Sequence, residues 1–190
     1  MNLLDIRNLS IELDTPNGRI LAVDKVSLSI KEGEVRGLVG ESGSGKSLLA
    51  QAIIGVLNDK WHVHADRFHW RGIDLLRLNI AERKALLCRD IAMIFQEPMS
   101  CLDPTTLVGA QLNEAIDPSQ FTGYFWQRKK QRKASVIKLL HKVGIKKHSE
   151  CINSYPHQLT EATCQRVMIA IALAGRPILL IADEPTAAME

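Results

Sequence analysis

The sequence predicts an α/β fold whose central sheet is mostly parallel. Segments with helical spacing of apolar residues alternate with short apolar runs, of which residues 91–95 and 178–182 are the clearest. A glycine-rich loop at residues 40–47 joins one apolar run to the start of a helical segment. This alternation is typical of a parallel sheet covered by helices. The 190 residues, 46% of them hydrophobic, are enough for one substantial core.

The N-terminal part of the chain is predicted to be extended. Residues 3–13 alternate apolar and polar side chains from Ile6 onward, as in a half-buried strand. The turn signal T-P-N-G at 15–18 leads into a second extended region at 20–30, and K-E-G-E at 31–34 marks another turn. Residues 35–39, V-R-G-L-V, are then predicted to form a buried strand.

Helices dominate the rest of the chain. Apolar residues follow helical spacing from Ser47 to residue 57, and the later helix ending at residue 174 is stopped by Gly175 and Pro177. The other expected elements are an extended region at 61–75, a helix at 81–89, a strand at 91–95, a mixed, largely helical segment at 104–117, a helix at 136–143 ended by Gly144, a helix continuing through 167–174, and a buried strand at 178–182.

The loop G-E-S-G-S-G-K-S fits the phosphate-binding pattern G-x-x-x-x-G-K-[ST] at every position. Its glycines permit tight turns that point backbone N–H groups at phosphates, and the positive end of the following helix adds to the attraction. In such loops the lysine reaches the β- and γ-phosphates, and the serine hydroxyl binds Mg²⁺. The residues expected to contact a nucleotide are therefore Gly40, Glu41, Ser42, Gly43, Ser44, Gly45, Lys46, Ser47 and Leu48.

The apolar run at 178–182 ends in two carboxylates, Asp183 and Glu184. In nucleotide hydrolases such a strand lies beside the strand that precedes the phosphate loop, so its end meets the triphosphate. Asp183 is then expected to hold Mg²⁺, and Glu184 to accept a proton from the attacking water. The alternative is a strand that ends in a solvated acidic turn.

These motifs occur in the order seen in ABC transporter ATPase subunits, which the chain resembles over essentially its whole length. The further motifs are F-Q-E-P at 95–98, Y-P-H-Q-L at 155–159 and L-L-I-A-D-E-P-T at 179–186. The segments G-L-V-G-E-S-G-S-G-K-S, I-F-Q-E-P-M-S-C-L-D-P and V-M-I-A-I-A-L-A are similar to the peptide-permease branch, and Q-L-T-E to its antimicrobial-peptide uptake subunits.

The resemblance implies a P-loop NTPase fold with an N-terminal antiparallel β-subdomain, a mostly parallel core sheet and a helical subdomain. Residues 1–190 are expected to be a single ATPase domain, with the Q-loop and the helical subdomain at roughly 91–175. The family has a further strand and a switch histidine beyond the acidic strand, and residues 187–190 match the start of its D-loop. The chain is therefore expected to be an incomplete domain, with the last core strand or strands missing and little hydrolysis alone.

The resemblance also assigns roles to individual residues. It implies ATP and Mg²⁺ as cofactors, with Ser47, Gln96 and Asp183 as metal-binding residues. Lys46, Gln96 and Glu184 are the implied catalytic residues, and Gln96 is the Q-loop glutamine that senses the γ-phosphate. The signature segment, which faces the partner subunit's nucleotide in the family's dimers, corresponds to Leu159, Thr160, Glu161, Ala162 and Thr163.

The signature segment departs from the family's usual L-S-G-G pattern. Thr160 keeps a hydroxyl and is expected to cap the following helix. Glu161 and Ala162 replace both glycines, which restricts backbone approach to a phosphate. Glu161 also adds a negative charge near an anionic phosphate, although that charge can instead favour the helix N-terminus. We therefore expect a weakened signature and two unequal sites in a dimer.

The family's usual adenine-stacking aromatic has no counterpart here. No Phe, Tyr or Trp precedes Gly40 in the sequence. Arg19, through its planar guanidinium, and Ile20, through its apolar surface, are the two alternatives for contact with the base.

The expected function is that of an ATPase subunit that energises peptide import. The implied partners are a second, homologous ATPase subunit, integral-membrane permease subunits and, indirectly, a periplasmic peptide-binding protein. The implied location is the cytoplasmic face of the bacterial inner membrane. One alternative is a nucleotide-binding regulatory subunit with little turnover. Another, an ABC ATPase acting on DNA or ribosomes, needs insertions or tandem cassettes that this sequence lacks.

Bulk composition indicates a soluble intracellular chain. The net charge of +3 does not by itself indicate a nucleic-acid or anionic-membrane partner, and no run approaches the ~18 apolar residues of a membrane span. The four cysteines, Cys88, Cys101, Cys151 and Cys164, show no C-x-x-C spacing and are expected to be reduced.

Two local clusters have ordinary explanations. His62 and His64 would share one face of a strand, but two ligands without a nearby third rarely make a metal site. F-T-G-Y-F-W at 121–126 precedes the basic run R-K-K-Q-R-K at 128–133. A docking surface or a solvated helix face is favoured there over nucleic-acid binding.

Overall fold

The computed structural model describes residues 2–185 and divides the chain into two units, Met1–Cys88 and Arg89–Glu190. Each unit has its own buried core. The prediction that residues 1–190 form a single domain stays a prediction. The expected D-loop start at 187–190 lies outside the described residues.

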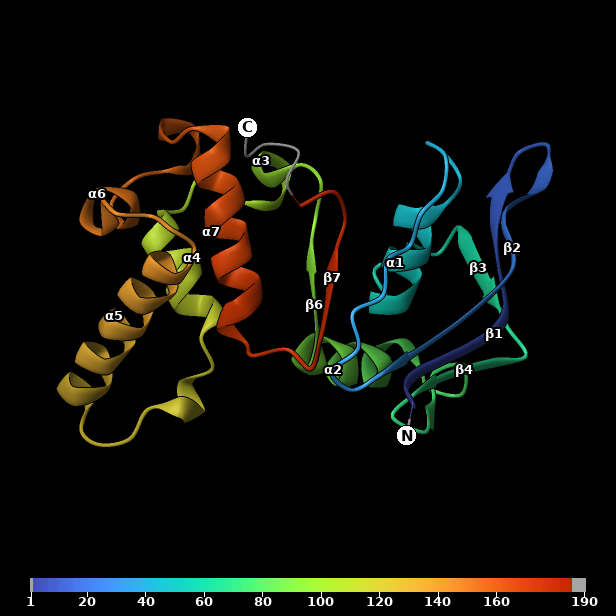
Figure 1. Cartoon of the computed structure of the whole chain (residues 1–190), viewed down its shortest axis with the longest axis horizontal. Coiled ribbons are helices and arrows are strands. Elements are labelled where there is room, and N and C mark those ends of the chain that lie inside the picture. The colour runs from blue at the N-terminus through green and yellow to red at the C-terminus, as the bar shows by residue number, and fades with distance from the viewer. Residues whose placement is uncertain (1, 186–190) are drawn as a thin grey trace. The chain divides into compact units, whose positions relative to one another are not determined.

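The first unit is built on an antiparallel sheet (Figure 1). Its strands are β1 (Asn2–Thr15), β2 (Gly18–Lys31), β3 (Trp61–His64), β4 (Arg67–Trp70) and β5 (Ile73–Asp74). The order is β2-β1-β4-β5, and β3 also pairs with β1. The predicted extended regions and the turn between the first two strands are confirmed.

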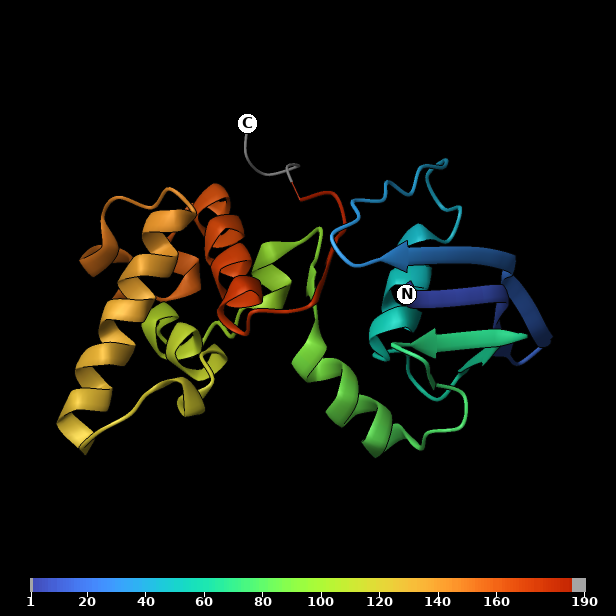
Figure 2. The same ribbon diagram turned by 60° about the horizontal axis from the view of Figure 1, so that its bottom comes forward.

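Alternation along β1 places apolar side chains in the core. Leu4 and Ile6 are fully buried and lie opposite Trp70 and Phe68 of β4, which are also fully buried. Such cross-strand pairs are the main stabilising contacts of a sheet. Helix α1 (Lys46–Ile54) lies on one side of this sheet, as Figure 2 shows, and buries most of its apolar residues.

The prediction of a buried strand at residues 35–39 is wrong. These residues have no regular secondary structure, and the side chains of Val35 and Val39 are 99% and 94% exposed. An apolar run becomes a strand only when a neighbouring strand takes up its backbone hydrogen bonds. Within the described residues, neither sheet includes this segment.

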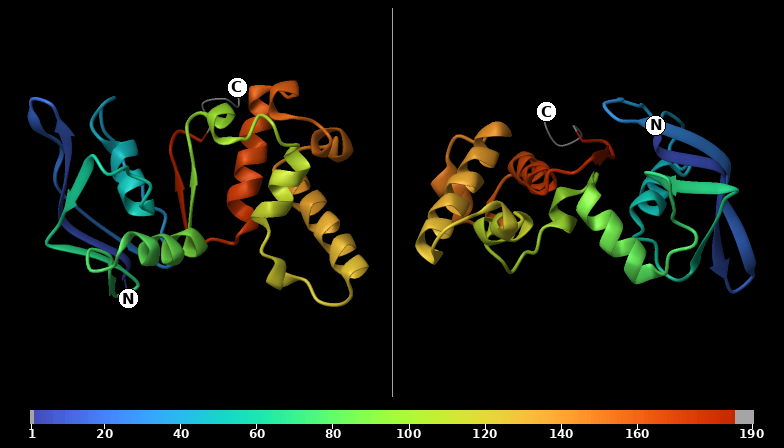
Figure 3. Two further views of the ribbon diagram at one scale, coloured as in Figure 1. Left: turned by 180° about the vertical axis from the view of Figure 1, so that it is seen from behind. Right: turned by 90° about the horizontal axis from the view of Figure 1, so that it is seen from below.

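The second unit contains a parallel pair of strands. These are β6 (Ile91–Ile94) and β7 (Leu179–Ala182), in the register Ile91↔Leu179 to Ile94↔Ala182. They confirm the two predicted strands and their parallel direction, but β7 is not fully buried, because Leu180 is 40% exposed. Helix α7 (Glu161–Ala174) lies between this pair and helices α4 (Val108–Ala115) and α5 (Phe125–Lys142), as Figures 1 and 3 show.

Helices make up the rest of the second unit and share one core. That core includes the fully buried Leu112, Val136, Leu140 and Val167. The helices are α3 (Pro98–Cys101), α4 (Val108–Ala115), η1 (Pro118–Gln120), α5 (Phe125–Lys142), α6 (His148–Ile152) and η2 (Pro156–Gln158), and α2 (Ile80–Asp90) precedes β6. In the part of the chain that the structure describes, no helix is long and apolar enough to span a membrane.

Helix α5 is longer than the predicted helix at 136–143. It ends close to the predicted point, just before Gly144, which adopts a left-handed φ of +79°. It begins eleven residues earlier than expected, at Phe125. The first half is largely exposed, so it has no apolar periodicity for sequence analysis to detect.

All four cysteines are free thiols, as predicted. Cys88 and Cys101 are exposed, whereas Cys151 and Cys164 are buried. Burial is the largest cause that raises the pKa of Cys151, to about 11, and it also raises the pKa of Cys164. The two buried thiols should therefore be unreactive at neutral pH.

We predict that two thiols of the native protein react rapidly with a disulfide reagent at pH 8. At that pH only about one molecule in a thousand carries the Cys151 thiolate, which is the reacting species. Titration with a chromogenic disulfide should give two fast equivalents in buffer and four in denaturant. Cys88→Ser and Cys101→Ser should each remove one fast equivalent. Four fast equivalents in buffer would contradict the burial of Cys151 and Cys164.

Candidate functional site

The phosphate loop has the backbone that its glycines predict. Gly43 and Gly45 have φ angles of +77° and +88°, in the left-handed region. Helix α1 then starts at Lys46, with no side-chain cap and no acidic residue in its first turn. The positive end of α1 is therefore not neutralised by its own residues, which suits an anion.

Lys46 lies across the loop. Its ammonium group donates hydrogen bonds to the backbone oxygens of Gly40, at 2.8 Å, and Glu41, at 2.7 Å. A Cβ added at Gly40 would lie 2.8 Å from the Ser44 hydroxyl oxygen, so a side chain there would require Ser44 to move. Lysine, loop amides and the Ser47 hydroxyl thus gather in one short segment, a donor set that fits the phosphates of a nucleotide and Mg²⁺.

The acidic site is formed at the carboxyl end of the parallel strand pair. The backbone N–H of Asp183 donates to the oxygen of Ile94 at 2.9 Å, which extends the pairing of β6 with β7. The side-chain amide of Gln96 donates to a carboxylate oxygen of Glu184 at 2.7 Å. Two predicted catalytic residues that are far apart in sequence are therefore in direct contact.

Glu184 has an unusual backbone conformation. Its φ of +47° lies in the left-handed region, which non-glycine residues rarely adopt. Such a conformation persists only where surrounding contacts hold it, and it is concentrated at functional sites. Here two hydrogen bonds hold the turn. One is donated by Gln96 to the Glu184 carboxylate, and the other is accepted by the backbone oxygen of the next residue, Pro185.

The hydrogen bond to Pro185 is donated by Gln165, a residue that was not among the predicted site residues. This side chain of α7 is fully buried, and its amide nitrogen donates to the backbone oxygen of Pro185 at 3.0 Å. It links the helix of the signature segment to the turn that carries Glu184. The sequence did contain a signal for this residue, a glutamine among the apolar residues of a predicted helix. Buried polar side chains usually have a specific hydrogen-bond partner.

The signature segment is a capped helix start. The Thr160 hydroxyl oxygen accepts from the backbone N–H of Thr163 at 3.3 Å and lies 2.8 Å from the Thr163 hydroxyl oxygen. Glu161 is exposed in the first turn of α7, and Leu159 packs against the helical core. The predicted cap is confirmed. Unlike α1, helix α7 has a carboxylate and a side-chain cap at its positive end.

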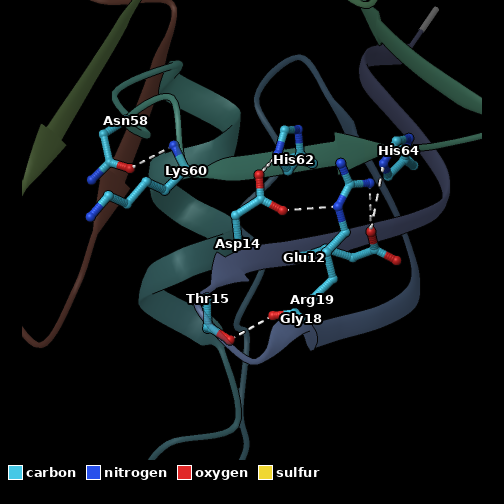
Figure 4. Close-up of polar contacts among 9 residues, drawn as sticks. All are labelled: Glu12, Asp14, Thr15, Gly18, Arg19, Asn58, Lys60, His62 and His64. Atoms are coloured by element: carbon cyan, nitrogen blue, oxygen red, sulfur yellow. Dashed lines mark hydrogen bonds and ion pairs between the residues drawn. The ribbon is translucent and has the colours of Figure 1, made fainter.

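Carboxylates near the β1–β2 turn engage the basic residues around them (Figure 4). Arg19 pairs with Asp14 at 2.9 Å and with Glu12 at 3.6 Å. His62 lies 2.5 Å from the other oxygen of Asp14, and His64 lies 3.9 Å from Glu12. The hydrogen bond with His62, followed by that from Arg19, holds the pKa of Asp14 below its usual value.

Two hypotheses from the sequence concern this region: contact of Arg19 or Ile20 with a nucleotide base, and a metal site at His62 and His64. The guanidinium of Arg19 is shared by two carboxylates, whereas Ile20 is 57% exposed, so Ile20 is the freer candidate for contact with a base. Across residues 2–185, no group of three or more His, Cys, Asp or Glu side chains could hold a metal. The pairing of Lys46 with Asp183 and Glu184 joins residues of different units and stays a prediction.

Comparisons with known proteins agree with these motifs. Residues 23–187 match the family described as "ABC transporter". The chain is 57% identical over 190 residues to the peptide transport system ATP-binding protein SapD of Salmonella typhimurium, and 44% identical over 190 residues to the dipeptide transport ATP-binding protein DppD of Escherichia coli. All of the chain is covered in both cases, but only 58% of SapD and 57% of DppD.

Solved structures support the fold. One is the dimeric post-hydrolysis state of the ATP-binding cassette MJ0796 bound to ADP and Pi, with 27% identity and a TM-score of 0.79. That comparison covers 98% of this chain and 76% of the other. The predicted α/β fold, with its antiparallel N-terminal sheet and helical part, is therefore confirmed.

We predict that Gly45→Ala destabilises the first unit more than Gly43→Ala does. Both glycines have positive φ, so both variants carry a similar backbone penalty of about 1–2 kcal/mol. Only at Gly45 would the new Cβ meet a neighbour, the Val23 methyl at 2.8 Å. Urea unfolding should show a further loss of about 1 kcal/mol or more for Gly45→Ala. Equal midpoints for the two variants would contradict this packing.

Proposed function

The chain belongs to the ABC transporter family, and on that premise we propose that it is the ATP-binding and ATP-hydrolysing subunit of a bacterial peptide transporter. The observation that carries the proposal is the phosphate loop, with two left-handed glycines, an uncapped helix start and a lysine across it. The two relatives named for peptide and dipeptide transport support the substrate class.

Phosphate binding is assigned to residues 40–48. The loop's backbone N–H groups and the first turn of α1 would face the phosphates, and Lys46 would exchange its contacts with two backbone oxygens for contacts with phosphate oxygens. Ser47 is exposed at the start of α1, with its hydroxyl available to a metal ion. When bound, MgATP supplies the phosphoanhydride bond whose hydrolysis releases the free energy for transport.

The acidic end of β7 is assigned to metal binding and proton transfer. Asp183 and Gln96 would hold Mg²⁺ together with Ser47. Glu184 acts as the base that accepts a proton from the attacking water. The Gln96 amide already holds one oxygen of this carboxylate at 2.7 Å, which orients the carboxylate and leaves its other oxygen for the water.

The signature segment is assigned to a partner's nucleotide. In a dimer, Thr160 to Thr163 would face the phosphates bound by the second subunit. The first turn of α7 already holds the Thr160 cap and the Glu161 carboxylate, so it attracts a phosphate less than a glycine-rich start would. The same observation favours a second candidate function, a nucleotide-binding regulatory subunit with little turnover of its own.

The proposed partners follow from this assignment. They are a second, homologous ATPase subunit, the integral-membrane permease subunits that hydrolysis drives and, indirectly, a periplasmic peptide-binding protein. The proposed location is peripheral, at the cytoplasmic face of the inner membrane. The proposed substrate is a peptide, as the name of the SapD relative supports, and the antimicrobial class is what the sequence resemblance implies.

We predict that Glu184→Gln lowers ATP hydrolysis by about 100-fold to 10,000-fold while ATP binding persists, because only the proton acceptor is lost. The measurement is phosphate release by the chain with its partner subunit, beside nucleotide binding by fluorescence. Glu114→Gln, an exposed carboxylate on α4, is the matched control and should leave both unchanged. Unimpaired hydrolysis by Glu184→Gln would refute the assigned base, and no hydrolysis by the unaltered pair would favour the regulatory function.

The unequal-site prediction is tested in the same mixed dimer. Lys46→Ala should abolish most hydrolysis, because it removes the phosphate-binding lysine from the site that faces the partner's signature. The double change Glu161→Gly with Ala162→Gly should raise hydrolysis, because it restores the close backbone approach of the usual signature. Equal activity of these two proteins and the unaltered dimer would reject the assignment of both segments.

A further inference from the structure

The positive charge of the chain is concentrated in one segment of the second unit. Residues 118–149 contain nine of the 24 lysines and arginines, whereas all 21 acidic residues lie elsewhere. The remainder of the chain is therefore net negative. The small overall charge of +3 hides this separation, which the proposed nucleotide site does not explain.

The same segment carries an exposed group of aromatic side chains, Tyr124, Phe125 and Trp126, here called the aromatic turn. They are 69%, 79% and 67% exposed. The rings of Tyr124 and Trp126 stack with centroids 5.2 Å apart and planes 13° apart. Three consecutive exposed aromatic residues are a large apolar surface to leave in water, and such patches mark interaction sites.

Local contacts fix the aromatic turn to α5. The backbone N–H of Tyr124 donates to the Gln127 side-chain oxygen at 2.9 Å, and the Arg128 side chain donates to the Gly123 oxygen at 2.8 Å. Phe121, just before the turn, packs against the helical core. The three aromatic side chains are thus presented by an anchored turn.

Basic residues continue the surface along α5. Trp126, Lys130 and Lys133 are spaced by four and three residues, which places them on one face of the helix. Lys133 also lines a hollow of about 670 Å³ together with Lys146 and Lys147. Figures 1 and 3 show α5 on the side of the second unit away from β6 and β7, and α7 lies between them.

The placement of these cations works against the stability of α5. The first turn of the helix has no acidic residue, and Arg128, Lys129 and Lys130 follow within its first two turns. Cations near the positive end of a helix are unfavourable. Nor does any carboxylate within residues 118–149 offset them. A negatively charged partner would remove this disadvantage.

We propose that the aromatic turn and the basic face of α5 bind the surface of a membrane containing anionic lipids. Tyr and Trp side chains favour the headgroup region, where one end of the ring system is apolar and the other wet. Lysines beside them add attraction to anionic headgroups. The mutual stacking of Tyr124 and Trp126 covers one ring face of each, which leaves less platform for nucleic-acid bases.

This surface shares no residue with the proposed nucleotide site, and the proposal of lipid binding does not rest on the proposed ATPase function. The Phe121 ring packs against the helical core, and the Arg132 guanidinium lies 5.7 Å from its centroid. Phe121 therefore supports the aromatic turn and is not proposed to contact lipid. Direct lipid contact would hold the subunit at the membrane by its own residues, in addition to any contact with a permease.

The test is flotation of the full 190-residue chain with vesicles. Equimolar phosphatidylcholine and phosphatidylglycerol vesicles should bind it, and pure phosphatidylcholine vesicles should not. The triple change Lys129→Gln, Lys130→Gln and Lys133→Gln should weaken binding by about 100-fold, at about fivefold per lysine lost near the surface. The charge-matched control is Lys31→Gln, Lys60→Gln and Lys84→Gln, all exposed in the first unit, and it should bind as the unaltered chain does.

A second readout follows insertion of the aromatic turn in the otherwise unaltered chain. Trp70 is fully buried, so in the Trp61→Phe variant bromine-labelled lipids should quench the Trp126 emission, and Trp126→Phe should abolish the quenching. Equal flotation of the two triple-lysine variants, or no quenching of Trp126, would overturn the proposal. So would release of the bound chain by single-stranded RNA that binds the same lysines more tightly, because the surface would then be a nucleic-acid site.

Discussion

The parallel pairing of β6 with β7 is the constraint on which the second unit depends. It joins two short segments and leaves their carboxyl ends side by side, so that Gln96 reaches Glu184 across 88 residues of sequence. The regular elements between them are all helices, and α7 packs onto this pair through Met168 and Ala172 against Ile94. The buried Gln165 then ties α7 to the turn after Glu184, so the helix that starts at the signature segment is linked to the acidic site by one hydrogen bond.

Two helix starts in this chain illustrate how sequence decides what a helix N-terminus can bind. Helix α1 follows a left-handed Gly45 and has no cap and no acid in its first turn, which leaves its positive end for a phosphate. Helix α7 follows Thr160, which caps it, and Glu161 contributes a carboxylate to its first turn. The electrostatic field of the backbone is the same in both. A few side chains therefore make the start of α1 more favourable for an anion than the start of α7.

Much of the fold and the local part of the site could be predicted from sequence. The left-handed backbone of the phosphate loop was predictable from Gly43 and Gly45, and β6 and β7 were predictable because each apolar run has the other as its partner strand. The contact of Gln96 with Glu184 could not be predicted, since a hydrogen bond across 88 residues has no local signal; the family resemblance gave only a catalytic role to each residue. The strand prediction for residues 35–39 was wrong because an apolar run does not specify its partner strand. The first half of α5 was not predicted because its exposed residues show no apolar periodicity.

We propose that the phosphate loop and the acids after β7 hold one MgATP. The decisive measurement is calorimetric titration with ATP, in the presence and absence of Mg²⁺, of the unaltered chain and of Asp183→Asn, each with the partner subunit. We expect Mg²⁺ to tighten ATP binding to the unaltered chain, and Asp183→Asn to lose most of this gain while still binding ATP through the loop. Equal affinity with and without Mg²⁺, or an undiminished Mg²⁺ effect in Asp183→Asn, would contradict it.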